Sequence, residues 1–108
     1  MDDISLKDLI QLILQQAKEK GFGSLPEEVY IPEKIALIHD DISKAYEAYR
    51  HKKMTGEKSF ANELGDAAQR IFHIAAVMGI DLEGVILEKI KKNKDKAWNW
   101  QELNENHG

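Results

Sequence analysis

The chain has no cysteine among its 108 residues, which excludes thiol catalysis, disulfide bonds and thiolate metal sites. Since disulfides belong to oxidising compartments, a reducing compartment is expected. No apolar run approaches the roughly 20 residues that a helix needs to cross a bilayer, and the first residues lack the pattern of a signal peptide. The net charge of −4 argues against a general nucleic-acid-binding surface. We therefore expect a cytoplasmic protein that has neither a membrane nor a DNA or RNA polymer as its partner.

Proline is also scarce, with two residues, and no segment alternates apolar and polar residues in the manner of a strand. Apolar residues instead recur at helical spacing in four segments, which predicts an all-α fold in a single domain over residues 1–108. The expected helices cover residues 5–20, residues 32–51, residues 59–79 and a segment that begins at residue 82. A domain of this size leaves much of its surface exposed, so self-association is expected.

Several residues fit the ends of these helices. Ser5 and Asp8 form a capping-box pattern, and Gly21 suits a carboxy-terminal cap. Asp81 can cap the fourth helix. Gly65 lies inside the third helix, where glycine costs about 1 kcal/mol relative to alanine, so it predicts a close contact with a neighbouring helix.

Three residues have two interpretations each. Phe22 and Tyr30, in the connection over residues 21–32, could stack on a nucleobase, but we favour the interpretation that they anchor this loop to the core. His73 follows the third-helix strip that carries Arg70. A hydrogen-bonded histidine at a helix interface is favoured over a catalytic base there.

Acidic residues accompany the apolar stripes of the second and third expected helices. Glu63 and Asp66 are three residues apart, which places both carboxylates on one helix face, and Asp41 lies beside the stripe of the other helix. If the two helices pack together, these groups can converge on a space of the size of a metal ion. Magnesium prefers oxygen ligands and commonly bridges protein carboxylates to substrate phosphates. On spacing alone, a solvated acidic face is the commoner explanation of such a pattern.

Basic residues gather at the end of the fourth expected helix and in the connector over residues 52–58. The cluster at the helix end consists of Lys89, Lys91, Lys92, Lys94 and Lys96. The helix dipole favours cations at this end, which gives the cluster a structural explanation, but the same lysines could hold phosphate. For the connector, a solvated loop is favoured over a phosphate contact.

Four pieces of the sequence keep a common order and spacing over about residues 30–96. They are His39–Arg50, Asn62–Ala67, Gly79–Glu83 and a Lys-x-x-x-Asn formed by Lys89 and Asn93. Together they resemble the MazG-like family of nucleoside triphosphate pyrophosphohydrolases. That family carries Glu-x-x-Glu on one helix, Glu-x-x-Asp on the next and Lys-x-x-x-Asn-x-x-Arg downstream.

The resemblance implies an all-α, four-helix bundle that is completed by assembly into a homodimer or homotetramer, with the site partly at subunit contacts. Members of the family use magnesium to cleave a nucleoside triphosphate between the α and β phosphates, releasing the monophosphate and pyrophosphate in a house-cleaning role. Carried over by position, Glu63 and Asp66 match the second motif, and Asp41 is a shortened counterpart of the first Glu. The resemblance therefore implies that these three carboxylates are the metal ligands and catalytic residues.

The substrate-binding positions are matched less fully. Lys89 and Asn93 match the downstream motif and would hold phosphate, while Lys96 replaces its arginine and loses the bidentate fork. Lys44 stands where the family has the second Glu of its first motif, which reverses the charge. It is expected to pair with one of the cluster's carboxylates in the place of the metal, or to meet substrate.

The lysine at position 44 could affect metal binding and catalysis in three ways. The site could bind magnesium with fewer ligands, or Asp40 or Glu47 could substitute for the missing carboxylate. Alternatively, the protein is a catalytically impaired homo-oligomer that binds nucleotide or a protein partner.

Overall fold

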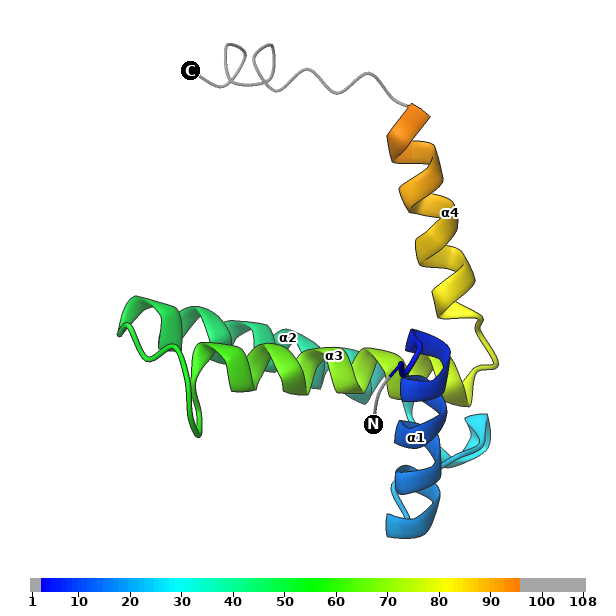
Figure 1. Cartoon of the computed structure of the whole chain (residues 1–108). Helices are drawn as coiled ribbons and strands as arrows, with labels where there is room; N and C mark the ends of the chain where they lie inside the picture. Colours follow the sequence, from blue (N-terminus) through cyan, green and yellow to red (C-terminus); the bar gives the residue numbers. More distant parts are fainter. Residues whose placement is uncertain (1–2, 96–108) are drawn as a thin grey trace.

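The computed structural model describes residues 3–95, of which the side chains are described to residue 94. The chain forms α1 (Leu6–Lys20), a short 3-10 helix η1 (Pro26–Glu28), α2 (Ile31–Arg50), α3 (Phe60–Val77) and α4 (Leu82–Asp95). No strand occurs over this range, and the predicted all-α fold is confirmed (Figure 1). None of the helices over residues 3–95 combines the length and the apolar character needed to cross a bilayer.

The ends of α1 follow the predicted capping chemistry. The Ser5 hydroxyl accepts the backbone N–H of Asp8 at 3.1 Å, and the Asp8 carboxylate accepts the backbone N–H of Ser5 at 3.4 Å. Gly21 ends the helix in the left-handed region, at φ 75°, which glycine adopts without steric cost.

The starts of α3 and α4 are capped in a similar way. The Ser59 hydroxyl accepts the backbone N–H of Asn62 at 3.1 Å, and the Asp81 carboxylate accepts the backbone N–H of Gly84 at 3.1 Å. Both caps satisfy N–H groups that the first turn of a helix leaves unpaired. The predicted helix boundaries therefore agree with the structure to within two residues.

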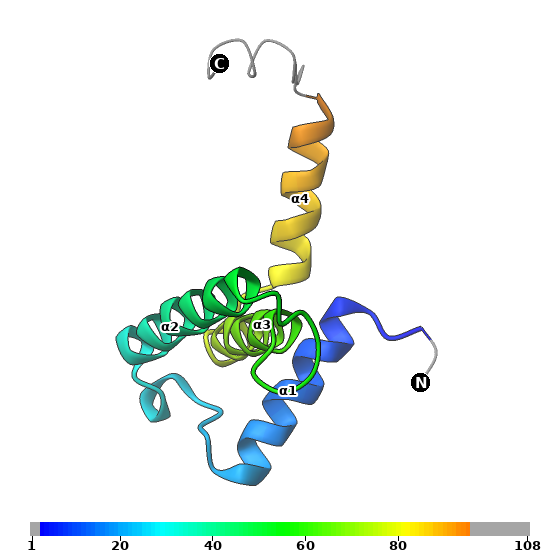
Figure 2. The ribbon, with the colours of Figure 1, turned by 90° about the vertical axis from the view of Figure 1, so that its left-hand side faces the viewer.

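The pair formed by α2 and α3 is the centre of the molecule. The two helices run antiparallel and side by side, and α1 packs across α3 (Figures 1 and 2). Helix α4 stands away from this pair and meets α1 near its own start, where the backbone N–H of Lys7 donates to the Glu83 carboxylate at 3.0 Å. This arrangement places facing residues of α2 and α3 close together and leaves most of α4 uncovered.

The core of one chain is small. Its buried apolar residues are mostly alanine, with few larger side chains (Ile10, Ala17, Val29, Ala45, Ala48, Ala67, Ala75 and Val77). Large apolar side chains of the helices remain exposed instead: Ile42 is 47% exposed, Leu64 42% and Leu87 59%. Much of the apolar surface of α2 and α3 is therefore left uncovered by the rest of the described chain. Apolar surface left uncovered on several helices is typical of a subunit that associates with others.

Two expectations are wrong within the described chain. Phe22 is 61% exposed and Tyr30 is 70% exposed, so neither ring anchors its loop to the core. Among the described residues, no atom outside its own helix would lie within 4 Å of a Cβ added at Gly65, so no other described helix packs closely there.

The connector between α2 and α3 is exposed, as predicted, but its backbone is fixed at both sides. The backbone N–H of Lys53 donates to the carbonyl of Ala48, and the Lys53 carbonyl accepts the N–H of Phe60, each at 2.9 Å. The rings of Tyr49 and Phe60 pack with centroids 5.5 Å apart. These contacts make a defined corner where α2 ends and α3 begins.

Candidate metal-binding site

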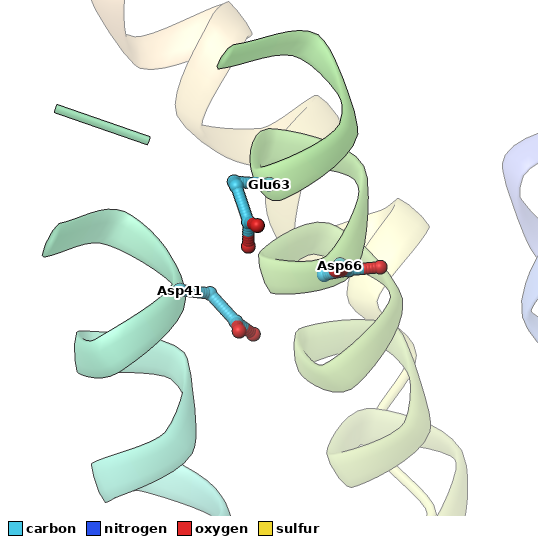
Figure 3. A group of neighbouring side chains, drawn as sticks. All are labelled: Asp41, Glu63 and Asp66. Atoms are coloured by element: carbon cyan, nitrogen blue, oxygen red, sulfur yellow. The ribbon is translucent and has the colours of Figure 1, made fainter. Parts of the chain in front are cut away.

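Helices α2 and α3 bring Asp41, Glu63 and Asp66 together. One carboxylate oxygen of each residue lies within 4.8 Å of the others (Figure 3). Asp41 comes from α2, whereas Glu63 and Asp66 lie one turn apart on α3, as their spacing predicts. The three predicted ligands thus form one cluster, which we call the acidic cluster.

Burial distinguishes the three carboxylates. Asp41 is 4% exposed and Glu63 is 7% exposed, while Asp66 lies at the more open edge of the cluster. An ionised carboxylate that is removed from water requires a cation or several hydrogen-bond donors close by. Asp41 and Glu63 therefore each need a cation or hydrogen-bond donors nearby to remain ionised.

Arg70 is the cation that pairs with the Asp41 carboxylate. The Arg70 Nε donates to Asp41 Oδ2 at 2.8 Å, and the Asp41 side chain is 6% exposed against 35% for Arg70. The sequence places Arg70 one turn after Asp66 on the same helical strip, but it gives no sign that Asp41 is the partner. The sequence does not predict this ion pair, because it joins two helices.

Glu63 has no such partner. Within residues 3–94, no side chain forms a hydrogen bond or an ion pair with its carboxylate. Figure 3 shows this carboxylate pointing into the space between α2 and α3, toward Asp41. A carboxylate that is 7% exposed and unpaired, beside two others, fits a site that a divalent cation completes.

Lys44 does not enter the acidic cluster. Its ammonium donates to Asp40 Oδ2 at 3.0 Å, and the two side chains are 58% and 52% exposed. This hydrogen bond and the charge of Asp40 raise the pKa of Lys44 above its ordinary value, and the charges of Glu63 and Asp41 act in the same direction. Lys44 is thus a full cation beside the cluster, but its pairing partner is Asp40.

The predicted phosphate-binding residues of α4 lie elsewhere in one chain. Lys89 and Asn93 are exposed on α4, which leads away from the pair of α2 and α3 (Figure 2). Lys96 falls outside the described residues. One chain therefore assembles the predicted metal ligands but does not bring Lys89 and Asn93 to them.

A cavity of about 420 Å³ opens beside Asp66, on the side of α3 that faces α1. Its lining combines an aromatic ring, two cations and polar side chains, namely Phe22, Lys34, Gln69, Arg70 and His73. The His73 Nε2 donates to the Gly23 carbonyl at 2.8 Å and the residue is 8% exposed, which confirms the predicted hydrogen-bonded helix-interface histidine. This hydrogen bond ties the loop that carries Phe22 to α3.

Comparisons of the chain with protein-family models, curated proteins and solved structures find no match. Any functional assignment therefore depends on the sequence resemblance and on the geometry of the acidic cluster.

Proposed function

We propose that the chain is a magnesium-dependent nucleoside triphosphate pyrophosphohydrolase of the MazG-like type. The observation that carries the proposal is the Glu63 carboxylate, which is 7% exposed and unpaired within the described chain, and lies within 4.8 Å of Asp41 and Asp66. Such a donor set suits a hard divalent cation. A bound divalent cation would neutralise phosphate charge and lower the pKa of a coordinated water.

The chain's own residues have separate roles in this proposal. Asp41, Glu63 and Asp66 would hold the cation on two rigid helices. Arg70 is partly exposed and would turn from Asp41 to a phosphate oxygen once the cation takes over that carboxylate. Its guanidinium presents several donors to phosphate oxygens.

The 420 Å³ cavity beside Asp66 would take the nucleoside. The exposed Phe22 ring at this cavity offers a face for stacking, which tolerates different bases. The exposure of Phe22, which contradicts a core-anchoring role, is compatible with this second interpretation. In the reaction, water adds to the α phosphorus and the bond to the β-phosphate oxygen breaks, so that a monophosphate and pyrophosphate leave.

We further propose that the active species is a homodimer or homotetramer. Apolar side chains exposed on α1, α3 and α4, together with the open surface at Gly65, support this proposal, because a second copy of the chain would cover them. Assembly would also be the route by which Lys89 and Asn93 of one copy approach the acidic cluster of another.

One observation favours a second candidate, a catalytically impaired homo-oligomer that binds nucleotide or a protein partner. Arg70 already pairs with Asp41, and Lys44 stands where the family has a carboxylate. Two cationic side chains near three carboxylates reduce the attraction for a divalent ion. This candidate predicts nucleotide binding without turnover.

Pyrophosphate release from a panel of nucleoside triphosphates, measured with and without magnesium, tests the two candidates. The wild type should release pyrophosphate only with magnesium, and Glu63→Gln should lose the activity. Glu57→Gln, a change of an exposed connector residue, should behave as the wild type. No magnesium-dependent release from any nucleotide would reject the hydrolase and leave the impaired relative.

A further inference from the structure

A second pocket lies at the corner where α2 ends and α3 begins. It has a volume of about 450 Å³, and its lining includes Lys44, Glu47, His51, Lys53, Lys58 and Glu63. We call it the corner pocket. Glu63 belongs both to this lining and to the acidic cluster, so the two sites are directly adjacent.

The corner pocket carries an excess of positive charge. Its Glu47 carboxylate already contacts His51 Nε2 at 2.8 Å and Arg50 at 3.6 Å. Over residues 3–94, neither Lys53 nor Lys58 has a carboxylate within ion-pair distance. Lys44 adds a third ammonium group, which its neighbour Asp40 keeps charged. The carboxylates of the lining are Glu47 and Glu63, and Asp40 pairs with Lys44, so Lys53 and Lys58 are the lining lysines without a carboxylate partner over residues 3–94.

Backbone hydrogen bonds fix the main chain of the corner, from which the side chains of Lys53 and Lys58 extend. Lys53 is fixed by its hydrogen bonds to Ala48 and Phe60, which join the end of α2 to the start of α3. Lys58 directly precedes Ser59, the residue that caps α3. A pocket with a fixed backbone loses less conformational freedom when it binds an anion than a mobile loop would.

The corner pocket, the acidic cluster and the cavity beside Asp66 follow one another along α3. Glu63 borders the corner pocket, and Asp66 one turn later borders the cavity that also contains Arg70 and His73. The acidic cluster therefore lies between a cationic pocket and a cavity with an aromatic ring. A nucleoside triphosphate has the same sequence of parts, with an anionic end, a reacting phosphorus and a base.

We propose that the corner pocket binds the pyrophosphate portion of a nucleoside triphosphate through Lys44, Lys53 and Lys58. The inference rests on the proposed function and extends it, because it assigns the leaving group to a site on α2 and the connector. It also gives Lys44 a role: the position that is acidic in the MazG-like motif becomes a phosphate contact. Because Glu63 repels an anion until a cation neutralises it, pyrophosphate should bind more tightly when magnesium is present.

Isothermal titration of the full chain with inorganic pyrophosphate, at constant free magnesium, tests the proposal. The double variant Lys53→Gln with Lys58→Gln should bind pyrophosphate at least tenfold more weakly than the wild type. Lys52→Gln changes a lysine of the same connector that does not line the pocket, and it should bind as the wild type. The double variant with arginine at positions 53 and 58 keeps the charge and should retain the affinity.

Unchanged affinity in the double glutamine variant, an equal loss in Lys52→Gln, or no binding of pyrophosphate by the wild type would each overturn the corner-pocket assignment. A separate magnesium titration without pyrophosphate reports on the proposed function alone. Magnesium binding that depends on Glu63, combined with pyrophosphate binding that ignores the lysines, rejects only the corner pocket. Absence of magnesium binding rejects the proposed function.

Discussion

Arg70 of α3 donates a hydrogen bond of 2.8 Å to the buried Asp41 carboxylate of α2. The contact joins the two central helices and supplies one internal cation to the acidic cluster. It leaves Glu63 without a partner in the described chain, although Glu63 is nearly as buried. Within the described residues, one carboxylate of the cluster is therefore paired with a cation of the chain, and the nearby Glu63 carboxylate is not.

Replacement of Arg70 should separate these two effects. Arg70→Met removes the partner of a buried carboxylate, which should lower the free energy of unfolding by about 1–3 kcal/mol without magnesium. Magnesium should then restore more stability to the variant than to the wild type, because no internal cation competes for Asp41. Urea unfolding with and without magnesium measures both quantities.

Arg50→Met is the matched control, because Arg50 pairs with the exposed Glu47 and lies outside the acidic cluster. Its unfolding free energy should change by less than about 1 kcal/mol, as for most exposed ion pairs. If both variants lost the same free energy of unfolding, the buried Arg70–Asp41 pair would stabilise the fold no more than an exposed ion pair does.

Neutralisation of Glu63 should remove the response to magnesium. Glu63→Gln keeps the shape of the side chain and removes a charge that has no ion-pair partner within residues 3–94, so stability without magnesium should be retained or raised. At 100 times its dissociation constant, a ligand stabilises the folded state by about 2.7 kcal/mol, and this gain should be lost in the variant. Thermal unfolding at increasing magnesium concentration measures it.

The exposed Glu57→Gln should keep the full response to magnesium. If Glu63→Gln responds to magnesium as the wild type does, Glu63 is not a ligand and the proposed site is wrong.

Much of the fold could be predicted from the sequence because its signals are local. Ser5, Gly21, Ser59 and Asp81 set helix ends through hydrogen bonds that span three or four residues, or through a backbone conformation that glycine favours. The spacing of Glu63 and Asp66 likewise fixes their common face on α3. The convergence of Asp41 with these two residues could then be predicted on the single further assumption that α2 and α3 pack together.

The errors arise where an interaction crosses between helices. Periodicity identifies an apolar stripe, but it does not say whether the same chain covers it, and Ile42 and Leu64 remain exposed here. In the same way, Arg70 and Asp41 are 29 residues apart, and no spacing rule joins them. Lys44 was expected to pair within the cluster, yet Asp40, one turn earlier on the same helix, is its partner.

A carboxylate at position 44 should strengthen the metal site. Lys44→Glu removes a cation beside the cluster and adds a fourth carboxylate there, so magnesium affinity should rise by about tenfold. The new contact between two acidic groups at positions 40 and 44 should cost a few tenths of a kcal/mol in stability. Titration calorimetry with magnesium measures the affinity.

Lys18→Glu makes the same change of charge on an exposed part of α1, so it controls for the net charge of the protein. Equal gains in affinity from the two variants would show that the effect of position 44 is not local. A pyrophosphohydrolase activity that appears only in Lys44→Glu would identify the native chain as the impaired relative.

The surface between α1 and α3 should be the place where self-association can be broken. A groove of about 700 Å³ runs there, lined by Leu9, Leu12, Phe72 and the open position of Gly65, and Leu12 is 45% exposed. If a second copy covers this groove, Leu12→Glu buries a charge in an apolar contact and should shift the protein from oligomer to monomer. Sedimentation equilibrium over a range of protein concentrations measures the shift.

Lys18→Glu, on the same helix but outside the groove, should leave the mass unchanged. A wild type that sediments as a monomer, or a Leu12→Glu variant that remains fully assembled, would rule out this groove as the interface between copies.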